Sequence, residues 1–260
     1  MAYTSSLAKE SLKKEVWEPG KVIPISEGPY RFRIVVHCSP QGRQKAIFQN
    51  GEHSYFSYVQ LLDGNGTWIK RGAMIVPVLP DGRFIMTVEQ RAARGLYHNP
   101  SIARINGRDV DLSHHGALSS LEFPGGAIDP GEGLKAGFLR ELVEETGIEE
   151  QYGTYYARCR PIYPQAADLA LQQFVGVIFL SGFSYLERVV TDGGLTVYAL
   201  TKEDIMYNLQ SGVLCASQEV LMPWFFYKEI EEALASSSKL EQLISSGYLS
   251  FEHVKICSPL

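Results

Sequence analysis

Residues 122–148, EFPGGAIDPGEGLKAGFLRELVEETGI, constrain this chain most, because they join a glycine-rich stretch to a strongly patterned segment. Leu134, Phe138 and Leu142 recur at intervals of four residues, which indicates one apolar stripe on an amphipathic helix. Gly147 follows the last periodic residues and is typical of a left-handed C-terminal cap. The sequence therefore predicts a loop followed by an amphipathic helix.

Three glutamates of this helix, Glu141, Glu144 and Glu145, are close enough in spacing to point into one region. Like charges at such spacings repel, so they add no stability to the helix. Turn signals at 124–126 and 129–131 precede them, and the resulting loop can bring its backbone near the carboxylates. Carboxylate oxygens of this kind suit Mg²⁺, whereas a solvated acidic face is the alternative that the helix alone leaves open.

The complete spacing resembles the Nudix box, G-x5-E-x7-R-E-U-x-E-E-x-G-U, at every specified position. The matching residues are Gly126, Glu132, Arg140, Glu141, Leu142, Glu144, Glu145, Gly147 and Ile148. The resemblance implies a Nudix hydrolase of the α+β class, an α/β/α sandwich in which a mixed sheet carries the Nudix loop and helix. It also implies hydrolysis of a nucleoside diphosphate linked to another moiety.

The resemblance assigns roles to the residues of the box. It implies that Glu141, Glu144 and Glu145 are ligands of Mg²⁺, or alternatively of Mn²⁺, with the carbonyl of Gly125 as a further ligand. Arg140 belongs with these glutamates to the expected catalytic group, and it is implied to order the box through internal pairing. The box residues expected to be structural are Gly126, Glu132 and Gly147.

A segment upstream of the box points to a substrate. Residues 89–94, Glu-Gln-Arg-Ala-Ala-Arg, resemble the E-Q-[YF]-R stretch of ADP-sugar pyrophosphatases, with the departure that an arginine follows the glutamine directly. Because arginine meets phosphate through two hydrogen bonds, Arg91 or Arg94 is the expected diphosphate contact. Pro164 resembles a marker of the ADP-ribose pyrophosphatase branch. The expected substrate is ADP-ribose or another ADP-sugar, cleaved to AMP and a sugar phosphate, with GDP-mannose or UDP-glucose as the alternative.

Related enzymes often place a catalytic base in a loop after the central strands. Residues 181–194 form such a loop, in which Glu187 is the first candidate for the base and Asp192 the second. A carboxylate there would take the proton of the attacking water.

Two regions are expected along the chain. Residues 1–62 form an N-terminal arm and a small antiparallel sheet, which in the ADP-sugar branch builds a homodimer. Phe56 and Tyr58 are candidates for stacking on adenine, although aromatic residues at a period of two also fit a buried strand. Residues 63–260 form the Nudix hydrolase domain, with a polar insertion at 95–120 interpreted as a long loop of the lid type, and with C-terminal helices.

Further elements of the larger region follow from local patterns. A hairpin is expected around Pro80-Asp81-Gly82, and a helix is expected to begin at the capping signal of Thr201 and Asp204. Pro223 is expected to interrupt an apolar run ahead of a helical region over 224–244. The pair His114-His115 is interpreted as solvent-exposed, because no third metal ligand accompanies it.

Composition excludes several function classes. The 24 Lys and Arg residues minus the 29 Asp and Glu residues give a net charge of −5, the wrong sign for a nucleic-acid partner. The longest apolar run contains glutamines, so no membrane partner is expected, and four scattered cysteines fit reduced thiols in the cytoplasm. An ADP-ribose-sensing regulator or a non-catalytic binding module is the alternative of another class, and the intact box favours catalysis over both.

Overall fold

The computed structural model describes residues 22–24, 31–39, 48–50, 53–63, 65–90, 102–115, 119–148, 151–162, 171–181, 189–190, 196–211 and 218–256. Contacts within the chain divide it into two compact units. The first comprises Met1–Arg71 with Tyr163–Gln172, and the second comprises Gly72–Ile162 with Gln173–Leu260.

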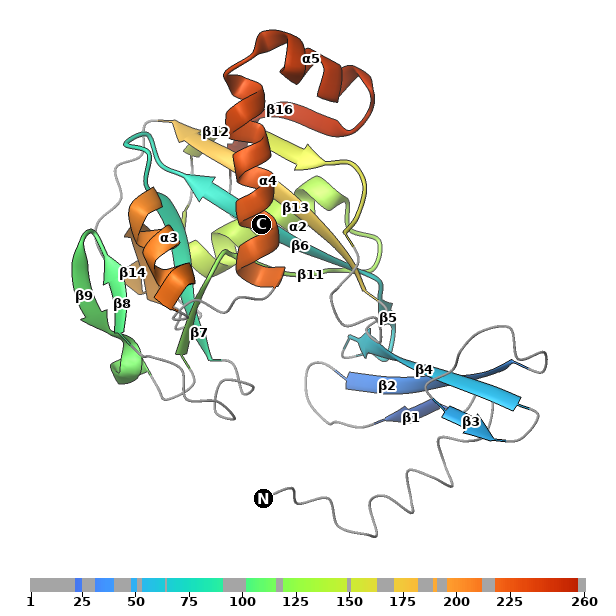
Figure 1. Ribbon diagram of the computed structural model, residues 1–260. Helices are drawn as coiled ribbons and strands as arrows, with labels where there is room; N and C mark the ends of the chain where they lie inside the picture. Colours follow the sequence, from blue (N-terminus) through green and yellow to red (C-terminus); the bar gives the residue numbers. More distant parts are fainter. Residues whose placement is uncertain are drawn as a thin grey trace. The chain divides into compact units, whose positions relative to one another are not determined.

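The first unit contains a small antiparallel sheet in the order β1-β2-β4-β3, with β5 also pairing with β4 (Figure 1). Its long strands are aligned over nine residue pairs, from Arg31 opposite Leu62 to Ser39 opposite Ser54. The expected N-terminal sheet is therefore confirmed. Its strands are β1 (Val22–Pro24), β2 (Arg31–Ser39), β3 (Phe48–Asn50), β4 (His53–Leu62) and β5 (Trp68–Ile69).

The second unit is built on a larger sheet whose described strands follow the order β14-β15-β7-β6-β13-β12-β16. Strands β6 and β7 pair only at their shared hairpin, Val78 opposite Phe84, around the expected turn at 80–82. Beyond it they diverge, and β10 pairs with β7 while β11 pairs with β6. The strands are β6 (Arg71–Val78), β7 (Phe84–Gln90), β10 (Ser119–Glu122), β11 (Gly125–Ile128), β12 (Gln151–Arg158), β13 (Gln172–Ser181), β14 (Val189–Val190), β15 (Thr196–Leu200) and β16 (Leu249–Ile256).

Helices cover both faces of this sheet, α2 on one side and α4 on the other (Figure 1). Phe138 and Leu142 of α2 pack in one core cluster with Ile85 of β7, whereas Trp224 of α4 packs in the other with Phe84. This arrangement confirms the α/β/α sandwich. The helices are α2 (Leu134–Thr146), α3 (Lys202–Ser211), α4 (Gln218–Leu234) and α5 (Ser237–Ser245). Each helix in the described part of the chain is too short or too polar to cross a lipid bilayer.

Helix α2 spans the predicted residues 134–146, and its apolar stripe is buried as expected. Gly147 ends the helix at φ 66°, the left-handed conformation that favours glycine, and its N–H donates to the carbonyl of Val143 over 2.8 Å. The helix that carries the box glutamates is therefore fixed at one end by its cap and along its length by the core.

The insertion is not the long irregular loop that its polarity suggested. Residues 102–115 form strand β8 (Ile102–Ile105), strand β9 (Arg108–Asp111) and a short 3₁₀ helix, η2 (Leu112–His115). The two strands are joined by Asn106 and Gly107, both at positive φ, the arrangement of a two-residue hairpin turn. Ala103, Ile105 and Leu112 are buried in the core, so this part of the insertion belongs to the scaffold.

Helix α4 also differs from expectation, because Pro223 lies inside it and does not interrupt it. Proline removes one backbone hydrogen bond, and here the buried side chains of Trp224 and Tyr227 hold the helix on the sheet. Their rings pack against Phe84, with centroids 5.3 Å and 4.8 Å from its ring.

Candidate active site

The loop before α2 approaches strand β6 so closely that only glycine fits at its start. The N–H of Ile75 donates to the carbonyl of Pro124 over 2.9 Å, which holds the loop on β6. A Cβ atom on Gly125 would lie 2.3 Å from the carbonyl oxygen of Ala73, far inside contact distance. Gly125 therefore brings the loop backbone flat against the sheet, beside the C-terminal half of α2.

The next residue, Gly126, lies directly against a box glutamate. A Cβ atom there would be 2.5 Å from one carboxylate oxygen of Glu141 and 2.7 Å from the other. A side chain at position 126 would collide with the carboxylate of Glu141, so glycine lets the backbone at 126 lie directly against it.

Glu145 is the second carboxylate that this loop engages. Its Oε2 accepts a hydrogen bond from the N–H of Gly125 over 2.9 Å. Burial raises the pKa of Glu145 to about 9, and the negative charge of Glu89 on β7 adds to the increase. Burial likewise raises the pKa of Glu141 to about 7, although the guanidinium of Arg140 opposes that increase. Both carboxyls therefore hold their protons more tightly than an ordinary glutamate does.

Arg140 links most of the box through its planar guanidinium group. It donates to both oxygens of Glu132 over 3.0 Å, and its Nη1 donates to Glu141 and Glu144 over 2.9 Å each. Its Nη2 also donates to the carbonyl of Ala127 over 2.8 Å, which ties the helix to β11. The pairing of Arg140 with Glu132 is the internal pairing that the resemblance to the Nudix box implies.

The donor set fits a hard divalent cation. Three carboxylates on α2 and the backbone loop before it could offer oxygen ligands to such a cation. Among the residues that the structure describes, no three His, Cys, Asp or Glu side chains are yet gathered around one point. A cation that used Glu141 and Glu144 would have to draw their oxygens away from Arg140, which contacts both.

Several candidates from the sequence cannot be placed against this site. Arg91, Arg94, Glu187 and Asp192 lie outside the described residues, as does Pro164. Phe56 and Tyr58 belong to strand β4 of the first unit, where only the backbone is described.

Glu89 is not among the site residues predicted from the sequence. This residue lies near the end of β7, and its side chain is hydrogen-bonded to Glu145. The sequence carried a signal, because this glutamate directly follows a short apolar run that is typical of a core strand. The prediction for residues 89–94 concerned the two arginines as diphosphate contacts and gave the carboxylate of Glu89 no role.

The His114-His115 pair is not simply solvent-exposed. The ring of His115 is half-buried, with its Nε2 3.1 Å from the hydroxyl of Tyr198 and its Nδ1 3.3 Å from Oγ1 of Thr196. Both nitrogens of His115 are occupied by protein partners, which makes it a packing residue between η2 and β15.

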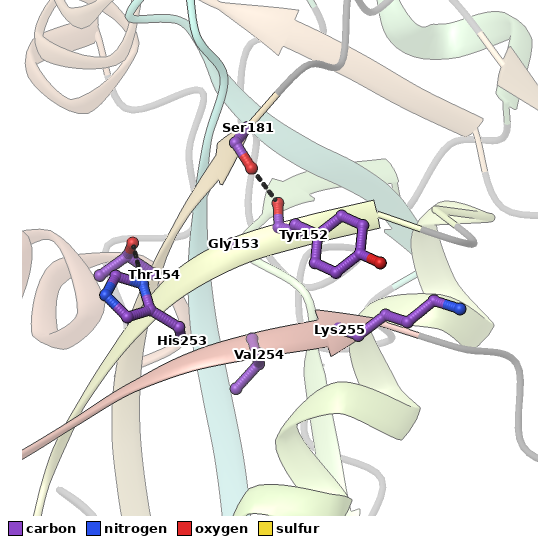
Figure 2. A pocket seen from close by; sticks show the side chains of 7 residues that line it. All are labelled: Tyr152, Gly153, Thr154, Ser181, His253, Val254 and Lys255. Atoms are coloured by element: carbon purple, nitrogen blue, oxygen red, sulfur yellow. Dashed lines mark hydrogen bonds between the residues drawn. The ribbon is translucent and has the colours of Figure 1, made fainter.

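A hollow of about 360 Å³ lies on the second unit, over strands β12 and β16 (Figure 2). Figure 2 shows the hydroxyl of Ser181 donating to the carbonyl of Tyr152, and Thr154 paired with His253. No box residue belongs to its lining. Because the hollow brings together no group of carboxylates, we place the chemistry at the loop and helix described above.

A comparison with protein-family models agrees with this placement. Residues 69–195 match the family model of the NUDIX domain. A crystal structure of an ADP compounds hydrolase is similar to this chain, with 15% sequence identity, a TM-score of 0.49, and coverage of 82% of this chain and 93% of that chain. None of the curated proteins matches. The family match covers the strands, loop and helix that bring the carboxylates together, and it identifies residues 69–195 as a NUDIX domain.

Proposed function

We propose that this Nudix hydrolase cleaves the diphosphate bond of a nucleotide sugar, ADP-ribose first among them, to AMP and a sugar phosphate. The observation that carries the proposal is the contact of the Gly125-Gly126 loop with Glu145 and Glu141. It brings carboxylates from the last two turns of α2 against a loop whose carbonyl groups could serve as further oxygen ligands. A diphosphate needs such a site because its negative charge must be neutralised before water can attack.

The residues of the box have two proposed roles, metal binding and the positioning of the metal ligands. Glu141, Glu144 and Glu145 would hold Mg²⁺, or alternatively Mn²⁺, together with the carbonyl of Gly125. The bound cation supplies charge neutralisation at the phosphates and lowers the pKa of the attacking water. Arg140 would hold the helix that carries the glutamates against the preceding loop through its contacts with Glu132 and Ala127.

Two roles fall to residues beyond the box. Arg91 or Arg94 would bind the diphosphate, since guanidinium groups recognise phosphate through paired hydrogen bonds. Glu187, or failing it Asp192, would accept the proton of the attacking water, a step typically worth about 10²–10⁴ in rate. These assignments rest on their sequence positions relative to β7 and β13.

We also propose that the chain forms a homodimer through its N-terminal sheet. The support is the sheet itself, an antiparallel element that forms a compact unit of its own. Light scattering coupled to size-exclusion chromatography of the full chain and of a chain lacking residues 1–62 tests this. A monomeric mass for the full chain would contradict it.

Phosphate release, coupled to a phosphatase, tests the activity across a panel of ADP-ribose, ADP-glucose, GDP-mannose, UDP-glucose and NADH. Each substrate is assayed with Mg²⁺ and with Mn²⁺, and Glu145→Gln and Glu232→Gln are compared with the native chain. Glu232 is an exposed residue of α4 that pairs with Lys239, so its variant controls for the loss of one carboxylate. We expect cleavage of ADP-ribose that is lost in Glu145→Gln alone. Hydrolysis of only GDP-mannose or UDP-glucose would overturn the ADP-sugar assignment, and silence across the panel would overturn hydrolysis of nucleotide sugars.

A further inference from the structure

Glu89 lies on the face of the sheet that helix α2 covers. Side chains alternate along a strand, so Ile85, Thr87 and Glu89 of β7 share one face. Ile85 packs in the same core cluster as Phe138 and Leu142 of α2, which identifies that face. Glu89 therefore points toward the end of α2 at which the box glutamates lie.

The carboxyl groups of Glu89 and Glu145 are in direct contact. The side chain of Glu89 is hydrogen-bonded to that of Glu145, and Glu89 is also the largest source of negative charge acting on it. The contact brings together two carboxyl groups that belong to different elements, α2 and β7.

A second polar side chain beside Glu89 has no partner. Ser120 of β10 lies directly opposite Glu89 in the antiparallel register, so the two side chains project from the same face as neighbours. Ser120 is completely buried, and within the described part of the chain its Oγ makes no hydrogen bond. A buried hydroxyl without a partner is costly, so its surroundings are built for a further polar group.

We propose that Glu89 is an additional ligand of the metal site, binding the same divalent cation as Glu145, and that Ser120 hydrogen-bonds a water ligand of that cation. The inference rests on the proposed function, since it assumes that Glu145 binds a cation. It extends the site beyond the Nudix box, from one helix and its loop to the central strand β7. A cation there would be held by carboxylates of both α2 and β7, and its water would give the Ser120 hydroxyl a partner.

Mn²⁺ binding tests the inference without relying on activity. The full chain is stripped of metal with EDTA and titrated with MnCl₂ while the unbound ion is followed by electron paramagnetic resonance. We expect Glu89→Gln to weaken the tightest Mn²⁺ site by about 10–100-fold, the usual loss when a group that shapes a metal site is removed. Ser120→Ala should weaken it less, and Glu232→Gln should leave it unchanged.

The Tm of the metal-free protein separates a ligand from a structural residue. A glutamine at 89 can still hydrogen-bond Glu145 and no longer repels it, so Glu89→Gln should melt at or above the Tm of the native chain. A lower Tm with native Mn²⁺ affinity would show a structural role and overturn the inference. If Glu89→Gln does not fold, Glu89→Asp shortens the reach of the carboxylate, and native affinity in that variant would overturn the inference as well.

The same titration distinguishes failure of this inference from failure of the proposed function. Loss of Mn²⁺ binding in Glu145→Gln with native binding in Glu89→Gln would contradict only the role of Glu89. Equal binding by the native chain and Glu145→Gln, or no binding by either, would contradict the metal site of the proposed function.

Discussion

The guanidinium group of Arg140 and the carboxylate of Glu132 form a two-pronged ion pair, in which Nε and Nη2 each donate to a different oxygen over 3.0 Å. Oε2 of Glu132 also accepts the N–H of Asp129 over 3.1 Å, so the pair connects α2 to the turn that precedes it. The pairing is local in sequence, yet it fixes the angle at which the loop meets the helix.

Arg140→Lys should lower the free energy of unfolding by about 2 kcal/mol, the range for hydrogen bonds to charged groups, because lysine keeps the charge and loses the fork. Chemical denaturation in EDTA measures it. Arg83→Lys is the matched control, since Arg83 pairs with a half-exposed Asp81 and should lose less than about 1 kcal/mol. Equal losses in the two variants would show that the fork geometry of Arg140 is unimportant.

Gly126→Ala should fold and lose activity. Its new Cβ would meet the carboxylate of Glu141, the end of a flexible side chain that can move away. Displacing a metal-site group by about 1 Å can cost on the order of 10²-fold in kcat. Steady-state kinetics and the Tm of each variant measure the two effects separately.

Gly133→Ala is the control from the same loop, because a Cβ atom there meets nothing within 4 Å. We expect native kcat and an unchanged or slightly higher Tm for it, since alanine restricts the unfolded chain. Similar activity losses in both variants would show that the loop as a whole, and not the Gly126–Glu141 contact, is sensitive.

The box could be predicted from sequence because its contacts are local. The periodicity of α2, its glycine cap and the spacing of its glutamates are all contained in residues 122–148. The contact between Glu89 and Glu145 could not be predicted this way, because it depends on how β7 and α2 pack. Strand β16 was missed for a similar reason. Most of its side chains are exposed, so its position is set by pairing with β12 and not by an apolar pattern.

The insertion shows a signal that was present and overlooked. Asn106-Gly107, flanked by the alternating residues of 102–105 and 108–111, is a strong hairpin signature. The polar composition of residues 95–120 suggested a loop. The hairpin is buried against residues of α3, which lie about a hundred positions further along the chain. The composition of the insertion therefore could not predict its contact with α3.

Asp204→Ala should destabilise the fold while sparing the chemistry. Its carboxylate is almost fully buried and accepts the N–H groups of Asn106, Gly107 and Thr201 over 2.8–3.0 Å. Leaving these three donors unpaired should lower the free energy of unfolding by about 3 kcal/mol or more, at roughly 1–3 kcal/mol for each buried unpaired group.

The control for that variant is Asp109→Ala. Asp109 lies on the exposed side of the same hairpin and contacts Arg104 at 3.5 Å, so its loss should cost about 0–1 kcal/mol. Denaturation curves give both values, and kcat at a temperature where both variants are folded gives the activity. A large loss of kcat in folded Asp204→Ala would contradict the scaffold role of the hairpin.

The raised pKa values of Glu141 and Glu145 predict how stability depends on pH. A carboxyl whose pKa is higher in the folded state than its ordinary 4.5 binds its proton more tightly when folded. Its contribution is therefore fully present below pH 4.5 and is lost as the pH rises through about 7 for Glu141 and about 9 for Glu145. In EDTA, the Tm of the native chain should fall relative to that of Glu145→Gln as the pH rises between these limits.

A divalent cation should reverse this trend, because it binds the deprotonated carboxylates and replaces their protons. Saturating Mn²⁺ should raise the Tm of the native chain more at pH 8 than at pH 5.5, and calorimetry in buffers of different ionisation enthalpy should detect released protons. Glu145→Gln should release fewer protons, because one of the protonated carboxyls is gone. Two results would contradict the assignment of Glu141 and Glu145 as metal ligands that are protonated in the metal-free protein. One is a larger rise in Tm with Mn²⁺ at pH 5.5 than at pH 8, and the other is metal binding at neutral pH without proton release.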